Sequence, residues 1–504
     1  MVRPEVRSKL SRSKILILWC LLACVAGITI SLNGCGASSG NHIIVTQTGK
    51  IEHVVVVFQE NRSPDNLFHD TVLIGRGADI ASSGVNSKGD TIQLTPIDLG
   101  TTGSNPQNYD LSHSHQAFLA MYDGGNMDGA DKIGCSPDAD CPPNAHPNPQ
   151  FKYVLPSDVQ PYFALAEQYT FGDRMFQTNQ GPSMPAHQYI ISGTSWNGTS
   201  GSNLFEAENP SLPANLGGTR GAGNNTGCSS PPTGTVQMID VTNPDPTTNE
   251  TQKVYPCFDH ATLIDLLDAQ KISWRYYANV KTCSPSAPCP TGIWVAPNAI
   301  QHICQPNAAP PNGTACTGPE WLSNVVAGTQ VLTDIANGQL PAVSWVIPDG
   351  KESDHAVDNT GEGPSWVASV VNAIGQSQYW NNTAIIITWD DWGGWYDHVV
   401  PPVRGDNSYE IGFRVPLIVV SPYAKAAYIS HVQHDFGSIL KFIEDTFGLT
   451  TIGPNAGFAD SRSDDLSDCF DFNQTPLNFS VIPAQYDAQH FLNDKRPAVD
   501  PDDD

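Results

Sequence analysis

The sequence is poor in basic side chains. Lys and Arg together number 25 of 504 residues, against 51 Asp and Glu, and the formal net charge is −26. Proteins that bind nucleic acid through its phosphate backbone carry the opposite sign, so we expect no nucleic-acid partner. Charged residues make up 15% of the chain and hydrophobic residues 39%, which excludes a disordered polyelectrolyte and allows a sizeable core.

The N-terminus has the composition of an export signal. Residues 1–14 hold five Lys or Arg, an apolar run follows over 15–32, and Asn33-Gly34-Cys35 comes next. The segment Leu32–Cys35 resembles a bacterial lipobox, in which Cys35 would be lipidated and become the new N-terminus. A soluble secreted product and an uncleaved anchor are the alternatives. We therefore predict an exported protein, extracellular or in the cell envelope, with a lipid anchor at Cys35 that attaches it to the membrane.

The remaining chain is predicted to form one large domain. Residues 36–50 are small and polar and are typical of a tether. Residues 51–490 follow as the domain, and 491–504 form an acidic tail that ends in three aspartates. Within the domain, the segments of about 195–255 and 280–320 are rich in Gly, Asn, Pro and Thr, so we interpret them as loop-rich insertions.

The cysteines are arranged for disulfides rather than for zinc. No Cys-x-x-Cys pattern occurs, and the spacers between close cysteines are long and rich in proline. Short loops closed by disulfides are typical of an oxidising compartment. Cys20, Cys24 and Cys35 belong to the export signal, and Cys469 is left over. The expected pairs are Cys135/Cys141, Cys283/Cys289 and Cys304/Cys316, with Cys228/Cys257 as a candidate fourth.

Near-continuous apolar runs predict a mostly parallel central sheet flanked by helices, an α/β fold. Strands buried on both faces read in this way because helices cover both sides of a parallel sheet. The predicted strands cover 51–58, 342–347, 384–389 and 415–420, and the predicted helices cover 161–168, 260–269, 365–375 and 436–447. Three of the strands end in acidic residues, at the edge where sites form in such sheets.

Two of these strand ends offer ligands for a divalent cation. Glu60-Asn61 follows the first strand and Asp390-Asp391 follows a later one. Adjacent carboxylates repel each other unless a proton or a cation lies between them, and hard oxygen ligands suit a divalent metal. A solvated turn is the alternative for Asp390-Asp391, but three flanking tryptophans favour a packed position.

A serine and two histidines complete the candidate site. Ser183 lies in Gly181-Pro182-Ser183-Met184-Pro185, where a rigid frame could hold a nucleophile that a metal activates. The lipase elbow Gly-x-Ser-x-Gly fails here because Pro185 takes its last position. His113 and His355 lie in polar loops and suit leaving-group protonation or binding of an anionic oxygen. Taken singly, each of these residues is more often an ordinary turn or surface residue.

In this order, the segments resemble one family. The segments are Glu60-Asn61-Arg62-Ser63 with Asp65, Asp110-x-x-His113, Asn126–Gly129, Gly181-Pro182-Ser183-x-Pro185, Asp354-His355, Thr388–Val399 and Gly412–Pro416. Together they resemble the bacterial phosphoesterase family of phospholipase C and respiratory-burst-inhibiting acid phosphatase, over residues of about 51–450. Pro64 departs from the family, which more often has Phe there.

The resemblance implies an alkaline phosphatase/sulfatase-like fold and a role for each residue. Glu60, Asn61, Asp390 and Asp391 would bind one divalent metal ion, together with the nucleophile Ser183. The all-oxygen ligand set favours a hard ion such as calcium, whereas histidines nearby could admit other ions. His113 and His355 would contact the phosphoryl oxygens or protonate the leaving group. The family has a further central histidine, for which His302 is the prediction and His260 the second candidate.

The predicted function is therefore a metal-dependent phosphoric ester hydrolase of the phospholipase C or acid phosphatase type, with a phosphate ester or a phospholipid as substrate. A sulfatase would need Cys/Ser-x-Pro-x-Arg, and Cys283-Ser284-Pro285-Ser286-Ala287 lacks the arginine. The remaining alternative is a non-catalytic, surface-anchored lipoprotein that keeps the fold as a binding module. That alternative predicts broken ligands, whereas the four oxygen ligands and the serine are all present.

Overall fold

A computed structural model describes residues 49–100, 109–136, 141, 147–211, 226–280, 292–356, 359–405, 409–453 and 457–496. All of them belong to one compact unit, Thr46–Asp504. The predicted export signal, nearly all of the tether, the end of the acidic tail and the Cys283/Cys289 pair lie outside the described residues.

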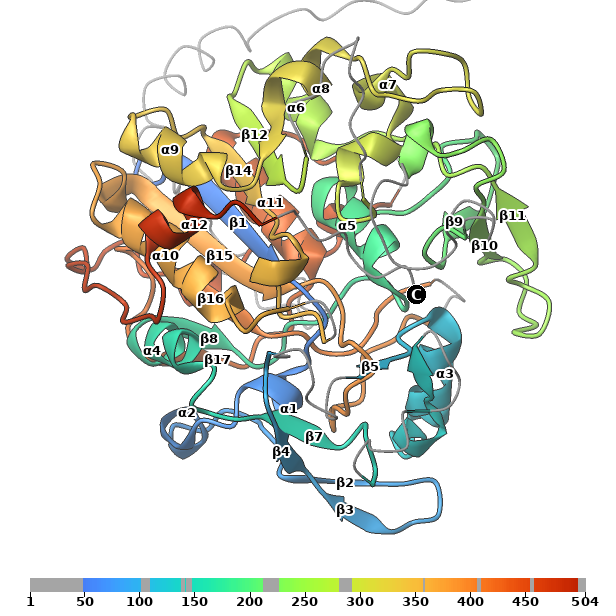
Figure 1. Ribbon diagram of the computed structural model, residues 1–504, viewed down its shortest axis with the longest axis horizontal. Coiled ribbons are helices and arrows are strands. Elements are labelled where there is room, and N and C mark those ends of the chain that lie inside the picture. Colours follow the sequence, from blue (N-terminus) through green and yellow to red (C-terminus); the bar gives the residue numbers. More distant parts are fainter. Residues whose placement is uncertain are drawn as a thin grey trace, which may run out of the picture. The chain divides into compact units, whose positions relative to one another are not determined.

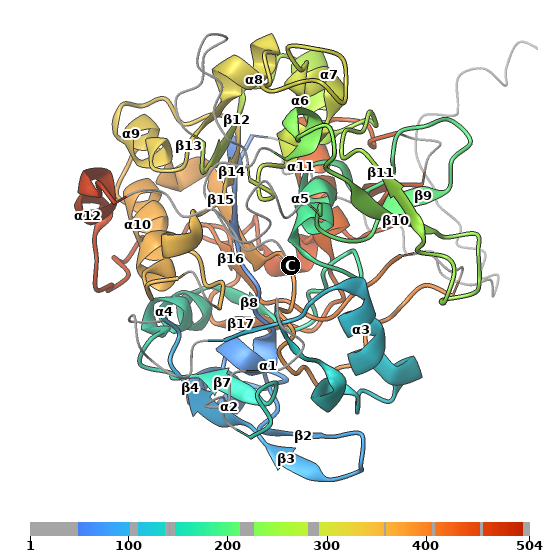
Figure 2. The same cartoon turned by 45° about the vertical axis from the view of Figure 1, so that its right-hand side comes forward.

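An eight-stranded sheet runs through the middle of this unit (Figures 1 and 2). Its strands lie in the order β13 (Val325–Ala327), β12 (Trp274–Ala278), β14 (Val343–Val346), β1 (His53–Gln59), β15 (Thr383–Trp389), β16 (Leu417–Val420), β8 (Thr170–Gly172) and β17 (Tyr428–Ser430). Every neighbouring pair is parallel except the two that include β16. The sheet is therefore mostly parallel, as predicted, and β16 alone runs against the others.

Helices cover both faces of the sheet and give three layers. Figure 2 shows the strands nearly edge-on with helices on either side. On one side lie α4 (Gln160–Gln168), α9 (Gln330–Ala336), α10 (Gly363–Gly375) and α12 (Ala488–Asn493); on the other lie α5 (Ser183–Ser192), α6 (Leu263–Ala269) and α11 (Phe436–Phe447). All seven residues of β15 are buried, which follows from this double cover and explains the apolar run in its sequence.

The predicted elements match the structure closely at their ends. The four predicted strands correspond to β1, β14, β15 and β16, and the four predicted helices to α4, α6, α10 and α11. The helix expected from residue 260 begins at Leu263, because Thr262 and Asp265 form a capping box there. Because β16 is antiparallel, the beginning of this strand, not its end, lies at the edge that carries the candidate site.

Smaller elements surround the sheet. The helices are α1 (Pro64–Leu67), α2 (Thr71–Gly75), α3 (His115–Tyr122), α7 (Gln301–Cys304) and α8 (Pro319–Asn324), and the strands are β2 (Ser83–Val85), β3 (Thr91–Gln93), β4 (Thr95–Ile97), β5 (Asp110–Leu111), β6 (Cys135–Ser136) and β7 (Lys152–Val154). The predicted insertion over 195–255 contains a small antiparallel sheet of β9 (Leu204–Glu206), β10 (Val236–Asp240) and β11 (Gln252–Val254).

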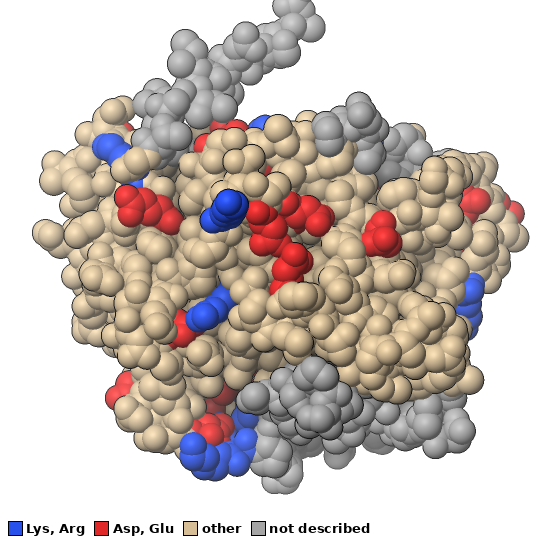
Figure 3. Space-filling view, turned by 90° about the horizontal axis from the view of Figure 1, so that it is seen from above, with Lys and Arg blue, Asp and Glu red and all other residues tan. Residues whose placement is uncertain are grey.

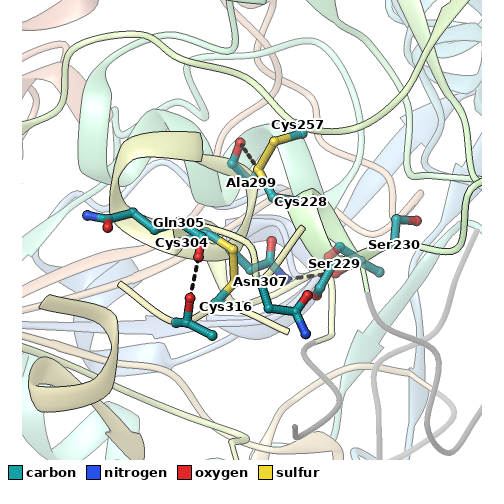
Figure 4. The surroundings of a disulfide bond; sticks show 12 residues. Cys228, Ser229, Ser230, Cys257, Ala299, Cys304, Gln305, Asn307 and Cys316 are labelled. Carbon is teal, nitrogen blue, oxygen red and sulfur yellow. Dashed lines mark hydrogen bonds between the residues drawn. A yellow bond between two sulfur atoms is a disulfide. The ribbon is translucent and has the colours of Figure 1, made fainter. Parts of the chain in front are cut away.

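Disulfides close the loops as the sequence predicts. Cys135–Cys141, Cys228–Cys257 and Cys304–Cys316 are bonded, and Cys469 is a buried thiol. Figure 4 shows Cys228–Cys257 packed against Ala299, close to Cys304–Cys316, so these two bridges fasten neighbouring loops. Among the described helices, none has the length and apolar character that crossing a bilayer requires.

Candidate active site

The ends of two central strands bring the predicted metal ligands together. β1 and β15 are parallel and in register, with Gln59 beside Trp389. The backbone N–H of Asp390 donates to the Gln59 carbonyl at 2.9 Å, and the N–H of Asn61 donates to Asp390 Oδ1 at 2.8 Å. Glu60, Asn61, Asp390 and Asp391 thus lie at one edge of the sheet.

Two glycines let the chain turn tightly after β15. Gly393 and Gly394 both have positive φ values, of 63° and 70°. A Cβ on Gly393 would lie 2.3 Å from the backbone oxygen of Asn61, and one on Gly394 would lie 2.8 Å from the backbone oxygen of Ser112. Both glycines are therefore needed for close approach, and the second brings the loop before His113 against the strand ends.

Ser183 reaches this edge from the first turn of a helix. It is the first residue of α5, after the N-cap Pro182, and its Oγ donates to Asp391 Oδ2 at 3.3 Å. The positive end of the helix dipole therefore lies beside the buried carboxylates, where it favours negative charge. The sequence suggested a rigid turn here. Helix α5 was missed because all ten of its residues are buried, so no polar face gives it a helical period.

The carboxylates are fully buried, and their charges require compensation. Glu60, Asp390 and Asp391 have no exposed surface. Burial, together with repulsion from Asp390 and Asp391, raises the pKa of Glu60 well above its ordinary value.

Three oxygens in this cluster fit a cation. Within the described part of the chain, Glu60 Oε2, Asn61 Oδ1 and Asp390 Oδ2 are buried without a hydrogen-bond donor. Two carboxylates and one amide oxygen form a hard ligand set. Since buried polar atoms are nearly always satisfied, this cluster fits a divalent metal ion.

His113 and His355 stand at the same place. His113 Nε2 lies 2.9 Å from Asn61 Nδ2, and its Nδ1 lies 2.8 Å from the Leu111 carbonyl. The rings of His113 and His355 are 6.1 Å apart between centroids. Gln59 fixes the loop before His355, because its side-chain amide bonds the backbone of Glu352 and Asp354 at 3.1 Å each.

His187 is a site residue that sequence reasoning missed. It lies one turn after Ser183 on α5, and its Nε2 is 3.2 Å from Glu60 Oε1. Burial lowers the pKa of His187 to about 4, so the ring is neutral. Glu60, His187 and Asp390 each offer a ligand atom within 4.8 Å of the others. The spacing Ser183-x-x-x-His187 would have revealed this residue had the helix been predicted.

The structure does not bring His302 to this cluster. His302 lies on α7, with Nδ1 2.6 Å from Asp259 Oδ1 and Nε2 3.0 Å from Asp265 Oδ1. Its side chain is 35% exposed. Hydrogen bonds to Asp265 and Asp259 outweigh burial and raise the pKa of His302 to about 9. Acidic side chains gather on the face over α6 and α8, which the view of Figure 3 shows near its centre.

His260, the second candidate, is buried beside α5 but also away from the strand ends. Its Nε2 lies 3.4 Å from Gln188 Oε1, and its Nδ1 lies 3.1 Å from the Ala261 carbonyl. Neither His302 nor His260 therefore has a described contact with Glu60, Asp390 or Asp391.

A buried ionic network supports the loops that carry the ligands. Arg414 donates from Nη2 to Asp397 Oδ2 at 2.9 Å and to Asp65 Oδ1 at 3.2 Å. His398 bonds Asp65 Oδ2 at 2.7 Å. Pro64, next to Asp65, occupies the first position of α1 after the N-cap Ser63, where proline fits without strain. Arg414 lies three residues before β16, so this network ties the segments that follow β1 and β15 to the one that precedes β16.

Comparison with known proteins gives one family and several relatives. The model of the phosphoesterase family matches residues 51–450. The non-hemolytic phospholipase C of Pseudomonas aeruginosa is 22% identical, with 87% of this chain and 60% of that protein aligned, and the non-hemolytic phospholipase C of Burkholderia pseudomallei is 26% identical over 44% and 37%. The chain thus spans about a third to three fifths of the length of these relatives.

Solved structures resemble the chain only distantly. A protein of the alkaline phosphatase superfamily from Vibrio parahaemolyticus is 10% identical, with 84% of this chain and 71% of that one covered and a TM-score of 0.34.

Proposed function

The chain belongs to the phosphoesterase family, and on this basis we propose that it hydrolyses phosphoric esters with Ser183 as the nucleophile. The observation that carries the proposal is the hydrogen bond from Ser183 Oγ to Asp391 Oδ2 at the N-terminus of α5. It joins a hydroxyl, a buried carboxylate cluster and a helix N-terminus, which together suit attack on an anionic phosphoryl group.

One divalent metal ion would be held by Glu60, Asn61, Asp390 and Asp391, with Ser183 beside them. When bound, such an ion would neutralise phosphoryl charge and lower the proton affinity of the serine hydroxyl. His187 would act as a positioning residue, because its neutral ring bonds Glu60 Oε1 and leaves Oε2 facing the cluster.

The chain's own residues would carry the two chemical steps. Ser183 Oγ passes its proton to Asp391 Oδ2, attacks phosphorus in line with the ester oxygen and forms a phosphoserine, while the alcohol leaves with a proton from a histidine. Water then gives one proton back to that histidine and attacks the phosphoserine; phosphate leaves, and Ser183 Oγ takes its proton back from Asp391. In the first turn of α5 the N–H of Met184 donates to Asn209 Oδ1 at 2.8 Å and Pro185 has no N–H, so the N–H of Ser183 and the helix dipole would stabilise the phosphoryl oxygens.

His113 and His355 would have different roles. Asn61 Nδ2 donates to His113 Nε2, and this bond turns Asn61 Oδ1 toward the carboxylates. His113 thereby positions a metal ligand, and its Nε2 carries no proton in this arrangement. We therefore assign leaving-group protonation to His355. His302, whose ring bonds two surface carboxylates, takes no part.

Substitution of the serine tests the nucleophile. Ser183→Ala should lower turnover by about 1,000-fold or more while phosphate and metal still bind. Ser192→Ala is the matched control, because Ser192 is equally buried at the far end of α5 and bonds only nearby backbone carbonyls. Near-normal turnover by Ser183→Ala would reject the assignment. If Ser183→Ala and Ser192→Ala both lose activity, the cause is damage to helix α5 rather than loss of the nucleophile.

Removal of a ligand tests the metal. Asp390→Asn should lose metal occupancy and activity together, whereas Asp245→Asn on an exposed loop should lose neither. Elemental analysis of the purified proteins measures occupancy directly. Unchanged occupancy in Asp390→Asn would reject this residue as a ligand.

The substrate class is open between phosphomonoesters and phospholipids. The relatives named phospholipase C favour a phospholipid, whereas the acid phosphatase resemblance favours a monoester. A panel of p-nitrophenyl phosphate, bis-p-nitrophenyl phosphate and phosphatidylcholine vesicles separates the two. Binding of all three without hydrolysis would favour the alternative, a non-catalytic surface lipoprotein.

A further inference from the structure

Cys469, the thiol left over from the disulfide pairs, lies beside a buried histidine and an aspartate at the sheet edge. Cys469 ends a short 3₁₀ turn over Ser467–Cys469, and His434 lies just before α11. Both are buried, and Asp468 is partly exposed. One atom from each lies within 4.8 Å of the other two.

The separations of these atoms match a tetrahedral metal centre. His434 Nε2 lies 3.3 Å from Asp468 Oδ1, and Cys469 Sγ lies 3.6 Å from the same oxygen and 4.0 Å from the nitrogen. Zinc bonds of about 2.0–2.3 Å at tetrahedral angles separate nitrogen from oxygen by about 3.3 Å, and sulfur from either by about 3.6 Å. Only the sulfur–nitrogen separation must shorten.

A second carboxylate orients the imidazole. Asp464 Oδ1 lies 2.8 Å from His434 Nδ1, whereas the other ring nitrogen, Nε2, faces Asp468 and Cys469. A carboxylate in this position fixes the ring and increases its basicity, as it does around most histidines that bind zinc.

The surroundings hold the three side chains in place. The Cys469 carbonyl accepts hydrogen bonds from Thr170 Oγ1 at 3.0 Å and from the Lys425 N–H at 2.9 Å. The backbone of His434 forms an isolated parallel β-bridge with Met175, just beyond β8. Asp468 and Asp464 have side chains 21% and 30% exposed, so an ion can enter from solvent.

We propose that His434, Asp468 and Cys469 bind a zinc ion, with water as the fourth ligand and Asp464 as the partner of His434. The site lies at the carboxyl end of β17, three strand positions or about 14 Å from β15, and is separate from the Ser183 cluster.

The test uses metal binding rather than activity, in the full chain carrying Asp390→Asn. This background removes a ligand of the other site, so failure of the proposed hydrolase leaves the result readable. After chelation and dialysis, the protein should bind one equivalent of zinc when zinc chloride is added. Cobalt chloride should give a thiolate-to-cobalt charge-transfer band in the near ultraviolet.

Three further substitutions assign the ligands. Cys469→Ser should abolish the band and weaken zinc binding at least about 100-fold, and Asp464→Asn should weaken it about 10–100-fold. Asp465→Asn removes the same charge from the same loop and should leave the cobalt band and the zinc affinity unchanged. Thermal unfolding of the metal-free proteins checks the fold of each variant.

Two outcomes would overturn the proposal. One is a protein that binds no zinc and gives no band, which would leave His434 as a structural residue held between Asp464 and Asp468. The other is a band that survives Cys469→Ser, which would place the thiolate elsewhere in the chain.

Discussion

Gly393→Ala should disable the candidate site without touching any of its ligands. The residue has a φ of +63°, and an added Cβ would lie 2.3 Å from the backbone oxygen and 2.8 Å from the backbone carbon of Asn61. Ordinary contact between a methyl carbon and a carbonyl oxygen begins near 3.4 Å. The loop after β15 and the end of β1 must therefore separate by about 1 Å.

Gly393→Ala should lower both the free energy of unfolding and the rate of hydrolysis. An alanine in the left-handed region lowers the free energy of unfolding by about 1 kcal/mol. The backbone shift that relieves the overlap lowers it by about 1–2 kcal/mol more. A displacement of about 1 Å between Asn61 and Asp390 would separate two of the proposed metal ligands, and such misplacement lowers reaction rates about 100-fold. We expect kcat/KM to fall by that factor and metal affinity to fall with it.

Gly448→Ala separates these two effects. Gly448 ends α11 with a φ of +65°, and a Cβ there would have no atom within 4 Å. This variant should lose about 1 kcal/mol of stability and keep full activity. Urea unfolding and initial rates on p-nitrophenyl phosphate measure both quantities. If Gly393→Ala hydrolyses the substrate as fast as Gly448→Ala, the argument that Gly393 sets the ligand spacing is wrong.

Three further predictions concern stability and location. Arg414→Gln should lower the free energy of unfolding by about 3–5 kcal/mol, because Asp65 and Asp397 lose their buried partner; an unchanged urea midpoint would contradict this. Burial lowers the pKa of His260 to about 4 from 6.5, so stability should be lost as pH falls from 6.5 to 4, by about 3 kcal/mol. His260→Gln should remove that part of the acid sensitivity, and parallel urea titrations at pH 7 and pH 4 would detect it. Cys35→Ser should release the protein from the membrane fraction; a wild-type protein that takes up no labelled fatty acid would reject the lipid anchor.

Sequence reasoning identified the strand ends because their signal is local. A buried strand such as β15 is a continuous apolar run, and the polar pair that follows, Asp390-Asp391, marks where it ends. Parallel strands place such ends at one edge, so Glu60 and Asp390 could be expected to meet. The short strands β8 and β17 have only three residues each and give no periodic signal, and neither was predicted.

The histidines show where local signals fail. His302 and His187 are both single histidines in the central part of the chain, and nothing in their flanking residues distinguishes them. The difference is that Ser183 starts a helix, so the residue four positions later shares its face. Prediction of this helix fails because burial on all sides removes the amphipathic pattern.

The amino-acid order was enough to predict the α/β class, the polar pairs at two strand ends, and the close disulfides Cys135–Cys141 and Cys304–Cys316. These depend on residues near one another in the chain. The fold was needed to reveal that β16 runs antiparallel, that Arg414 joins three loops, and that His187 lies beside Glu60. Several of these contacts join segments that are far apart in the sequence, with 127 residues between Glu60 and His187 and 349 between Asp65 and Arg414. No local propensity records which distant surface a buried side chain will meet.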